Sequence, residues 1–446
     1  MKRLLSDVGP ARESPAFRRL LAGRLLSSLG SSMTAFAVVL QVWELSRSSL
    51  DVGLLGLTFV PVLIIGLLGG AIADVVDRRK LTLATSVSLM AVSAAFAAQA
   101  YAQFGQLWLL YLLAMVQAVL QAISAPASRT FMPRLVRSDQ LTAAIALNTL
   151  SGRITMLAGP AMAGVIAAAF GLRMCYAVDA VSFVASLYAT ARLPAMRPQP
   201  APAAPSAPPA PGRLRAATEG LRFIRRRPVL VAAFLTDLDA MLLGLPVAIF
   251  PALNAAHFGG RPQTLGLLNA AVGVGGLLSA AMSGPTGRLS RPGRGLLAGT
   301  MIWGAAIACF GLTRSFPLAL VLLAVAGAAD TLTVTFRGSI VQTLTPDEFR
   351  GRVSSVEYII GTGGAPLGNV ETGTVAALTT PAFSAVSGGI GCLAAAALIA
   401  LLFPALTRYR PRAADTPPPK GANHDRSASV LSVTRAGKTD EAKGNP

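Results

Sequence analysis

Charged residues are scarce in this chain. They make up 13% of its 446 residues, whereas a soluble domain usually carries about 25%. The deficit is concentrated in long blocks without charge, and the mean hydropathy is +0.58. An apolar run of about 18 residues or more can cross a hydrocarbon core about 30 Å thick. The sequence therefore predicts an integral membrane protein.

Cysteine and histidine are also rare, with three and two residues in the whole chain. The cysteines fall in three different apolar runs, and the histidines form no cluster. No spacing typical of a disulfide framework or a metal site is present. The chain also has no P-loop and no nucleophile motif. We therefore expect no metal and no cofactor, and neither an enzyme nor an ATP-driven pump.

Twelve apolar segments can be marked as membrane spans, which predicts an all-α membrane protein with 12 transmembrane helices. The first segment is long for a cleavable signal and lacks a clear cleavage site, so we expect it to be retained. The segments lie near residues 20–43, 52–75, 81–104, 107–128, 142–171, 172–193, 229–256, 263–286, 295–313, 316–340, 353–378 and 382–405.

Lysine and arginine are distributed unevenly between the two sides of these spans. Of the 39 such residues, 33 fall in the two tails and the connections after even-numbered spans, and four fall in the other connections. Basic segments of multi-pass proteins remain in the cytoplasm. We therefore predict a cell-membrane protein with both termini cytoplasmic. Topology and contact with anionic lipid explain the net charge of +19, so nucleic-acid binding is not predicted.

A segment rich in proline and alanine divides the spans six and six. Residues 194–212 read as an extended tether, and 213–227 as a basic amphipathic helix. The predicted units are an N-terminal bundle at 1–193, this cytoplasmic linker at 194–227, a C-terminal bundle at 228–405 and a disordered tail at 406–446.

The two halves carry related loops. Arg129 and Arg337 are 208 residues apart, and so are Asp139 and Asp347. Parallel six-helix repeats joined by a tether are typical of transporters that bind substrate between the halves. A chance match of short motifs is the alternative explanation.

The spans, the two halves and the loop GGAIADVVDRRK at 69–80 resemble the major facilitator superfamily. GPAMAG (159–164), DLDAMLLGLPVAIFPAL (237–253), PDEFRGRVSSV (346–356) and APLGNVETG (365–373) are similar to its branch of drug and siderophore exporters, which includes enterobactin exporters and macrolide efflux proteins. The resemblance covers residues 17–405. It implies a monomer that moves a small molecule by alternating access.

The loop after the second span carries the first candidate site. In the resembled superfamily it contacts the start of helix 11, which we expect near Val353, and locks the cytoplasmic side. The alternative is that its cations anchor the topology and its acids are local partners. The predicted gating residues are Gly70, Asp74, Asp77, Arg78 and Arg79.

Acidic residues inside the spans are costly and therefore point to function. A carboxylate beside a water-filled cavity can take up a proton on one side and release it on the other. Structural hydrogen bonds or ion pairs are the alternative explanation for each acid. The candidates for proton coupling are Asp237, Asp330, Glu371 and Asp179. Asp239 points about 200° away from Asp237 on the same helix, and we favour Asp237.

Arg153 lies inside the fifth span and should need a buried acidic partner. Close helix packing there is expected from small residues and a proline, namely Gly152, Gly159, Pro160 and Gly164, although the exporter motif they resemble is incomplete. Cavity candidates are Met33, Phe36, Gln117 and Gln121. Apolar residues with a few amides suit a large amphipathic substrate.

The function predicted from these features is secondary-active export, with protons exchanged for a drug-like or siderophore-like molecule. The alternatives are a small-metabolite importer of the same fold and a sensor or scaffold that transports nothing. A sensor would need a folded cytoplasmic domain, and the tether and tail are too short and too polar to supply one.

Overall fold

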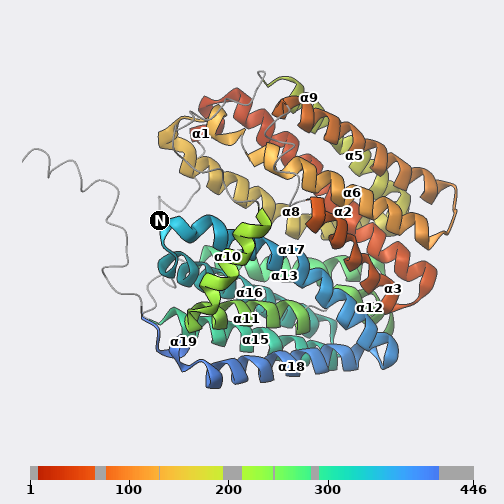
Figure 1. Ribbon diagram of the computed structural model, residues 1–446. Coiled ribbons are helices and arrows are strands. Elements are labelled where there is room, and N and C mark those ends of the chain that lie inside the picture. The colour runs from red at the N-terminus through yellow and green to blue at the C-terminus, as the bar shows by residue number, and fades with distance from the viewer. Residues whose placement is uncertain are drawn as a thin grey trace, which may run out of the picture.

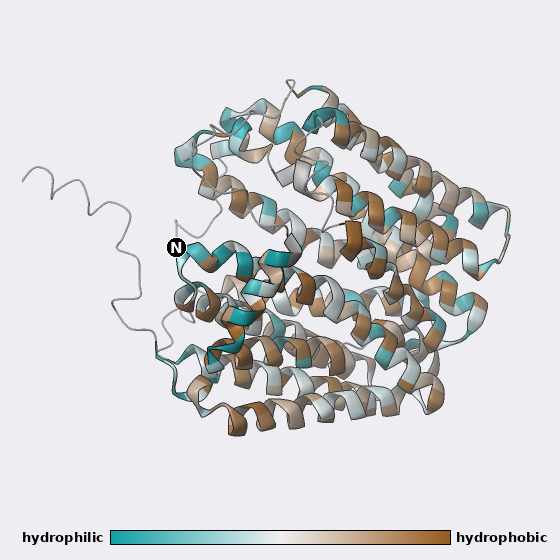
Figure 2. Ribbon diagram, viewed as in Figure 1, coloured by the Kyte–Doolittle hydropathy of each residue, from teal (hydrophilic) through white to brown (hydrophobic). Residues whose placement is uncertain are grey.

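The computed structural model describes residues 9–65, 77–129, 131–193, 213–244, 247–282 and 291–410. These residues form helices that run back and forth along one direction, with hydrophobic residues along their lengths and hydrophilic residues gathered at their ends (Figures 1 and 2). Ten helices in this part of the chain are long and apolar enough to cross a membrane.

The first half contains the helices before the proline-rich segment. Its long helices are α2 (Pro15–Ser46), α5 (Arg78–Tyr101), α6 (Leu107–Arg129), α8 (Leu141–Phe170) and α9 (Leu172–Ala191). Shorter elements are α1 (Gly9–Glu13), α3 (Ser49–Leu54), η1 (Leu55–Thr58), α7 (Met132–Leu135) and η2 (Ser138–Gln140). The second predicted span begins with α3 and η1, and helix continues to Ile65.

The second half follows the linker helix α10 (Arg213–Arg225). Its long helices are α11 (Pro228–Leu243), α13 (Pro262–Ala281), α15 (Pro292–Leu312), α16 (Phe316–Leu344), α17 (Asp347–Leu378) and α18 (Pro381–Leu402). Shorter elements are η3 (Val247–Ile249), α12 (Phe250–His257) and α19 (Pro404–Arg408).

Two predicted spans have different boundaries in the structure. The seventh span is not one continuous helix: α11 ends at a cap on Gly244, and α12 starts with Pro251 in its first turn. Proline lacks the N–H that a continuing helix would need. The eleventh span begins at Asp347, six residues before the expected Val353. Its first turn is therefore acidic, which favours a helix N-terminus.

The helix ends form two opposite ends of the bundle. One end carries α1, α10 and α19, and the other carries α3 and α12 (Figure 1). We call them the α10 end and the α3 end.

The halves pack closely towards the α3 end. Gly53 of α3 lies against the backbone of Asn369 and Gly373 in α17. Gly164 of α8 lies against α13, where a Cβ atom would be 3.1 Å from the Cα of Gly266. Small residues allow helix backbones to approach this closely in a membrane. Nearer the α10 end, Cβ atoms on Gly152 and Gly361 would meet nothing within 4 Å. The contacts between the halves are therefore tightest near the α3 end.

Candidate transport site

A buried ion pair lies between two helices of the second half. Asp237 of α11 accepts a hydrogen bond from Nη1 of Arg337 in α16. Their side chains are only 5% and 14% exposed. Arg337 was counted from sequence as a cation of the following loop, yet it lies seven residues before the end of α16. The pair satisfies two charges that would otherwise be costly in the membrane.

Asp330 connects this pair to the first half. It lies seven residues before Arg337 on α16, so both side chains leave nearly the same face of the helix. Asp330 interacts electrostatically with Arg337 and with Arg153 of α8. The residue keeps accessible surface although it lies mid-helix. Arg337 is thus shared by two acids, while Arg153 approaches Asp330 from the other half.

A cavity of about 780 Å³, lined by polar and apolar side chains, lies within the first half. Its described lining comes from α2, η1, α5, α6, α8 and α9, and Arg24 is the one charged residue in that lining. Serine and threonine side chains from all six of these elements give the cavity many hydroxyl groups. This surface suits a solute with several hydrogen-bonding groups.

Two of the four predicted cavity residues line this space. Gln117 and Gln121 are in its wall. Met33 and Phe36 are not: Met33 is fully buried and Phe36 is 6% exposed, and both belong to the hydrophobic core. Arg24 also lines the cavity and was not among the residues predicted from sequence to do so. A lone arginine on a serine-rich helix face was the available signal.

Asp179 ties three helices of the first half together. One carboxylate oxygen accepts hydrogen bonds of 2.7 Å from both Thr34 of α2 and Ser93 of α5. The other oxygen accepts one of 3.3 Å from Ser31. Asp179 is fully buried, and Ser31 also lines the cavity. The acid lies behind the cavity wall, and its hydrogen bonds favour a structural role.

Asp239 occupies a comparable position in the second half. It is 8% exposed, and its Oδ2 lies 3.8 Å from Sγ of Cys392 in α18. Its Oδ1 has no hydrogen-bond partner among the residues that the structure describes. Asp237 and Asp239 therefore face different helices, α16 and α18, as their spacing on a helix requires. Glu371 is half-buried on α17 and accepts a hydrogen bond of 3.2 Å from the adjacent Thr372.

The predicted gating loop is only partly described. Gly70 and Asp74 lie outside the described residues. Asp77 is the N-cap of α5 and accepts hydrogen bonds from the backbone N–H groups of Arg79, at 2.9 Å, and Lys80, at 3.4 Å. This is a local partnership of the kind left open as the alternative.

The basic partners of that loop also have defined neighbours. Nη2 of Arg79 donates to the carbonyl oxygen of Ala191 at the end of α9, at 2.6 Å, and Arg78 is the first residue of α5. Near the start of α17, Arg350 pairs with Asp347 at 3.0 Å and Arg352 with Glu219 at 3.0 Å. Arg350 and Arg352, which lie just before the expected start of helix 11 at Val353, thus have acidic partners of their own.

The small residues of α8 have different surroundings. Gly159 lies against Ser32 of α2, and Gly164 packs on α13, near the carbonyl oxygen of Pro262. The carbonyl oxygen of Pro160 lies beside Gly266. Gly152 is an exception to the predicted packing, because it lines the cavity and a Cβ there would touch nothing within 4 Å. In the described part of the chain, no three His, Cys, Asp or Glu residues are grouped to hold a metal ion.

Comparison with known proteins gives consistent matches over nearly the whole chain. A family model described as "Transmembrane secretion effector", within the major facilitator superfamily, matches residues 6–425. The enterobactin exporter EntS of Shigella boydii serotype 18 is 28% identical over 416 residues, which cover 93% of this chain and 97% of that protein. EntS of Escherichia coli O139:H28 is 27% identical over the same length.

Solved structures show the same fold at low identity. The nucleoside transporter NupG superposes with a TM-score of 0.69 at 13% identity, covering 89% of this chain and 100% of that one. A bacterial homologue of the iron transporter ferroportin gives a TM-score of 0.64 at 17% identity, covering 89% and 99%. The fold is therefore that of major facilitator transporters.

Proposed function

Because this chain belongs to the transmembrane secretion effectors of the major facilitator superfamily, we propose that it is a proton-coupled exporter of a siderophore-like or drug-like molecule. The family makes it a multi-pass secondary transporter and not an enzyme. Export and the siderophore-like substrate rest on the relatives, which are named as enterobactin exporters. Proton coupling rests on the charges between the helices.

The observation that carries the proposal is the position of Asp330. It keeps accessible surface in mid-helix, and it interacts electrostatically with Arg337 in its own half and with Arg153 in the other. Protonation of Asp330 would remove the charge that Arg153 faces across the two halves. Arg337 would keep its partner Asp237. The proton would therefore weaken the contact between the halves and leave the second half intact.

The substrate would bind in the cavity of the first half. Its hydroxyl and amide groups would pair with the polar groups of the solute, and Arg24 would favour a negative charge on it. Uptake of the substrate from the cytoplasm requires that the α10 end faces that side. The distribution of lysine and arginine supports this orientation.

The test is substrate-driven proton flux in proteoliposomes that contain the purified chain. Dyes, antibiotics and catecholate siderophores would be screened against an imposed pH gradient. Asp330→Asn should abolish the dependence of transport on the pH gradient, while Asp347→Asn should not. Asp347 is the matched control because it is an exposed acid that, among the residues described, pairs with the neighbouring Arg350. Full proton dependence in Asp330→Asn would refute the assignment of the proton to this residue.

A further inference from the structure

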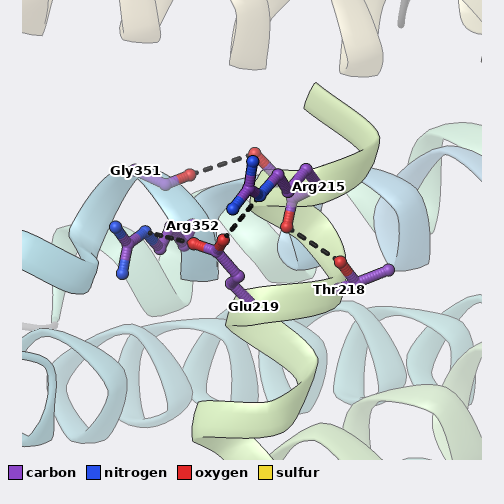
Figure 3. A network of polar contacts seen from close by, with 6 residues as sticks. Arg215, Thr218, Glu219, Gly351 and Arg352 are labelled. Carbon is purple, nitrogen blue, oxygen red and sulfur yellow. Dashed lines mark hydrogen bonds and ion pairs between the residues drawn. The ribbon is translucent and has the colours of Figure 1, made fainter. Parts of the chain in front are cut away.

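The linker helix α10 is held on the first turns of α17 by its inner face. Ala217, Gly220 and Ile224 are buried there, and Gly220 packs on the carbonyl group of Arg352. Glu219 lies between two arginines, with Nε of Arg215 at 3.2 Å and Nε of Arg352 at 3.0 Å (Figure 3). The acid of α10 is therefore already neutralised by contacts within the protein.

Aromatic contacts fix the end of α10 that leads into the membrane. The rings of Phe223 and Phe349 stack with centroids 4.5 Å apart. The guanidinium of Arg227 lies 4.3 Å from the Phe223 centroid and also donates to the carbonyl oxygen of Leu344. Of the four arginines at positions 222, 225, 226 and 227, Arg227 is therefore the one held by these contacts.

The other three arginines face outwards together. Arg222, Arg225 and Arg226 are exposed, and the described residues give none of them an ion pair. Together with Thr218 and Leu221, they line the α10 side of a hollow of about 430 Å³. Leu221 is 50% exposed beside these cations. We call these five residues the arginine hollow.

The position of the arginine hollow relative to the membrane indicates what it binds. Arg226 is two residues before Pro228, where the membrane helix α11 begins. Residues so close to the start of a span lie at the level of the lipid headgroups. An exposed leucine beside uncompensated arginines is typical of helices that lie in this interface.

We propose that the arginine hollow binds the headgroup phosphate of an anionic phospholipid in the leaflet at the α10 end. The three guanidinium groups supply charge and fork-shaped donors. Leu221 packs against the upper part of the acyl chains. A soluble phosphate would use the arginines but gain nothing from Leu221.

Bound lipid would also hold the linker in place. The inner face of α10 contacts α17, and its outer face would contact the bilayer. Lipid binding and docking of α10 on α17 would therefore stabilise each other. This inference does not depend on the direction of transport or on its coupling ion.

The test is native mass spectrometry of the full chain in detergent with added phosphatidylglycerol or phosphatidylcholine. The wild type should prefer phosphatidylglycerol. Juxtamembrane arginines contribute about fivefold each to binding of anionic lipid. R222Q/R225Q/R226Q should therefore bind phosphatidylglycerol roughly a hundredfold more weakly. R222K/R225K/R226K keeps the charges and should lose no more than about tenfold, because Lys still binds phosphate as a point charge.

The matched control is R12Q/R18Q/R19Q, which removes three positive charges near the start of the first span. It should bind phosphatidylglycerol like the wild type. Equal losses in the control and the glutamine variant would show a general charge effect and overturn the site. Displacement of the lipid by millimolar inorganic phosphate would overturn the lipid as the ligand. Unchanged binding in a folded R222Q/R225Q/R226Q protein would overturn the proposal altogether.

Discussion

The pair formed by Asp237 and Arg337 predicts an unequal effect of removing its two members. Removal of one partner of a buried ion pair costs about 3–5 kcal/mol, because the remaining charge is uncompensated. Asp237→Asn leaves Arg337 with Asp330 as a second acid, so the cost should lie near the lower limit. Arg337→Gln leaves Asp237 close to the charges of Asp330 and Glu357. Its cost should lie near the upper limit.

The double variant separates the pair from its surroundings. Asp237→Asn with Arg337→Gln removes both charges, so it should be destabilised by less than Arg337→Gln alone. The free energy of unfolding can be measured by titration with sodium dodecyl sulfate in mixed micelles, using the fluorescence of the three tryptophans. Costs that simply add in the double variant would refute the interaction. Equal costs for the two single variants would refute the sharing of Arg337 between two acids.

Three further substitutions test features elsewhere in the fold. Asp179→Ala removes the acceptor of three hydroxyl groups. At about 0.6 kcal/mol for each hydrogen bond in a membrane, the same titration should show that the free energy of unfolding falls by about 2 kcal/mol. An unchanged free energy of unfolding would exclude the structural role. Asp77→Ala removes the N-cap of α5 and should cost about 1 kcal/mol; an unchanged unfolding curve would mean that the cap contributes nothing. Gly53→Val pushes a side chain against the backbone of Asn369. Transport in vesicles should be lost, while membrane fractionation should still detect the protein. Transport at the wild-type rate would show that this close contact is dispensable.

Hydropathy was sufficient to predict most of the helices, because a span needs only enough consecutive apolar residues. Hydropathy failed at Gly244 and Pro251, where a glycine cap ends one helix and a proline lies in the first turn of the next, within a single apolar run. It also placed the start of α17 too late, because charged residues such as Arg350 and Arg352 look like a loop when hydropathy is the criterion. An acidic first turn was the better signal.

The partners of the intramembrane charges were harder to predict than their existence. The acids at 237 and 330 and the arginine at 153 stand out in an apolar sequence because each is costly there. Arg337 was missed because it lies near a basic loop, and only the packing of α16 on α11 turns it towards Asp237. Asp77 shows the reverse case, in which a residue assigned to a gate caps its own helix.

The glycine contacts at the α3 end have a consequence for the entropy of the transport cycle. When two surfaces pack together through long side chains, each side chain loses rotamer freedom. The cost in conformational entropy is up to about 2 kcal/mol for a long side chain. Gly53, Gly164, Gly266 and Gly373 have no side chain to restrict. Closure there orders little that was free before, and opening releases little. If these contacts open and close during transport, they do so with a small entropic penalty, and the balance between the two states is left to charged residues such as Arg153 and Asp330.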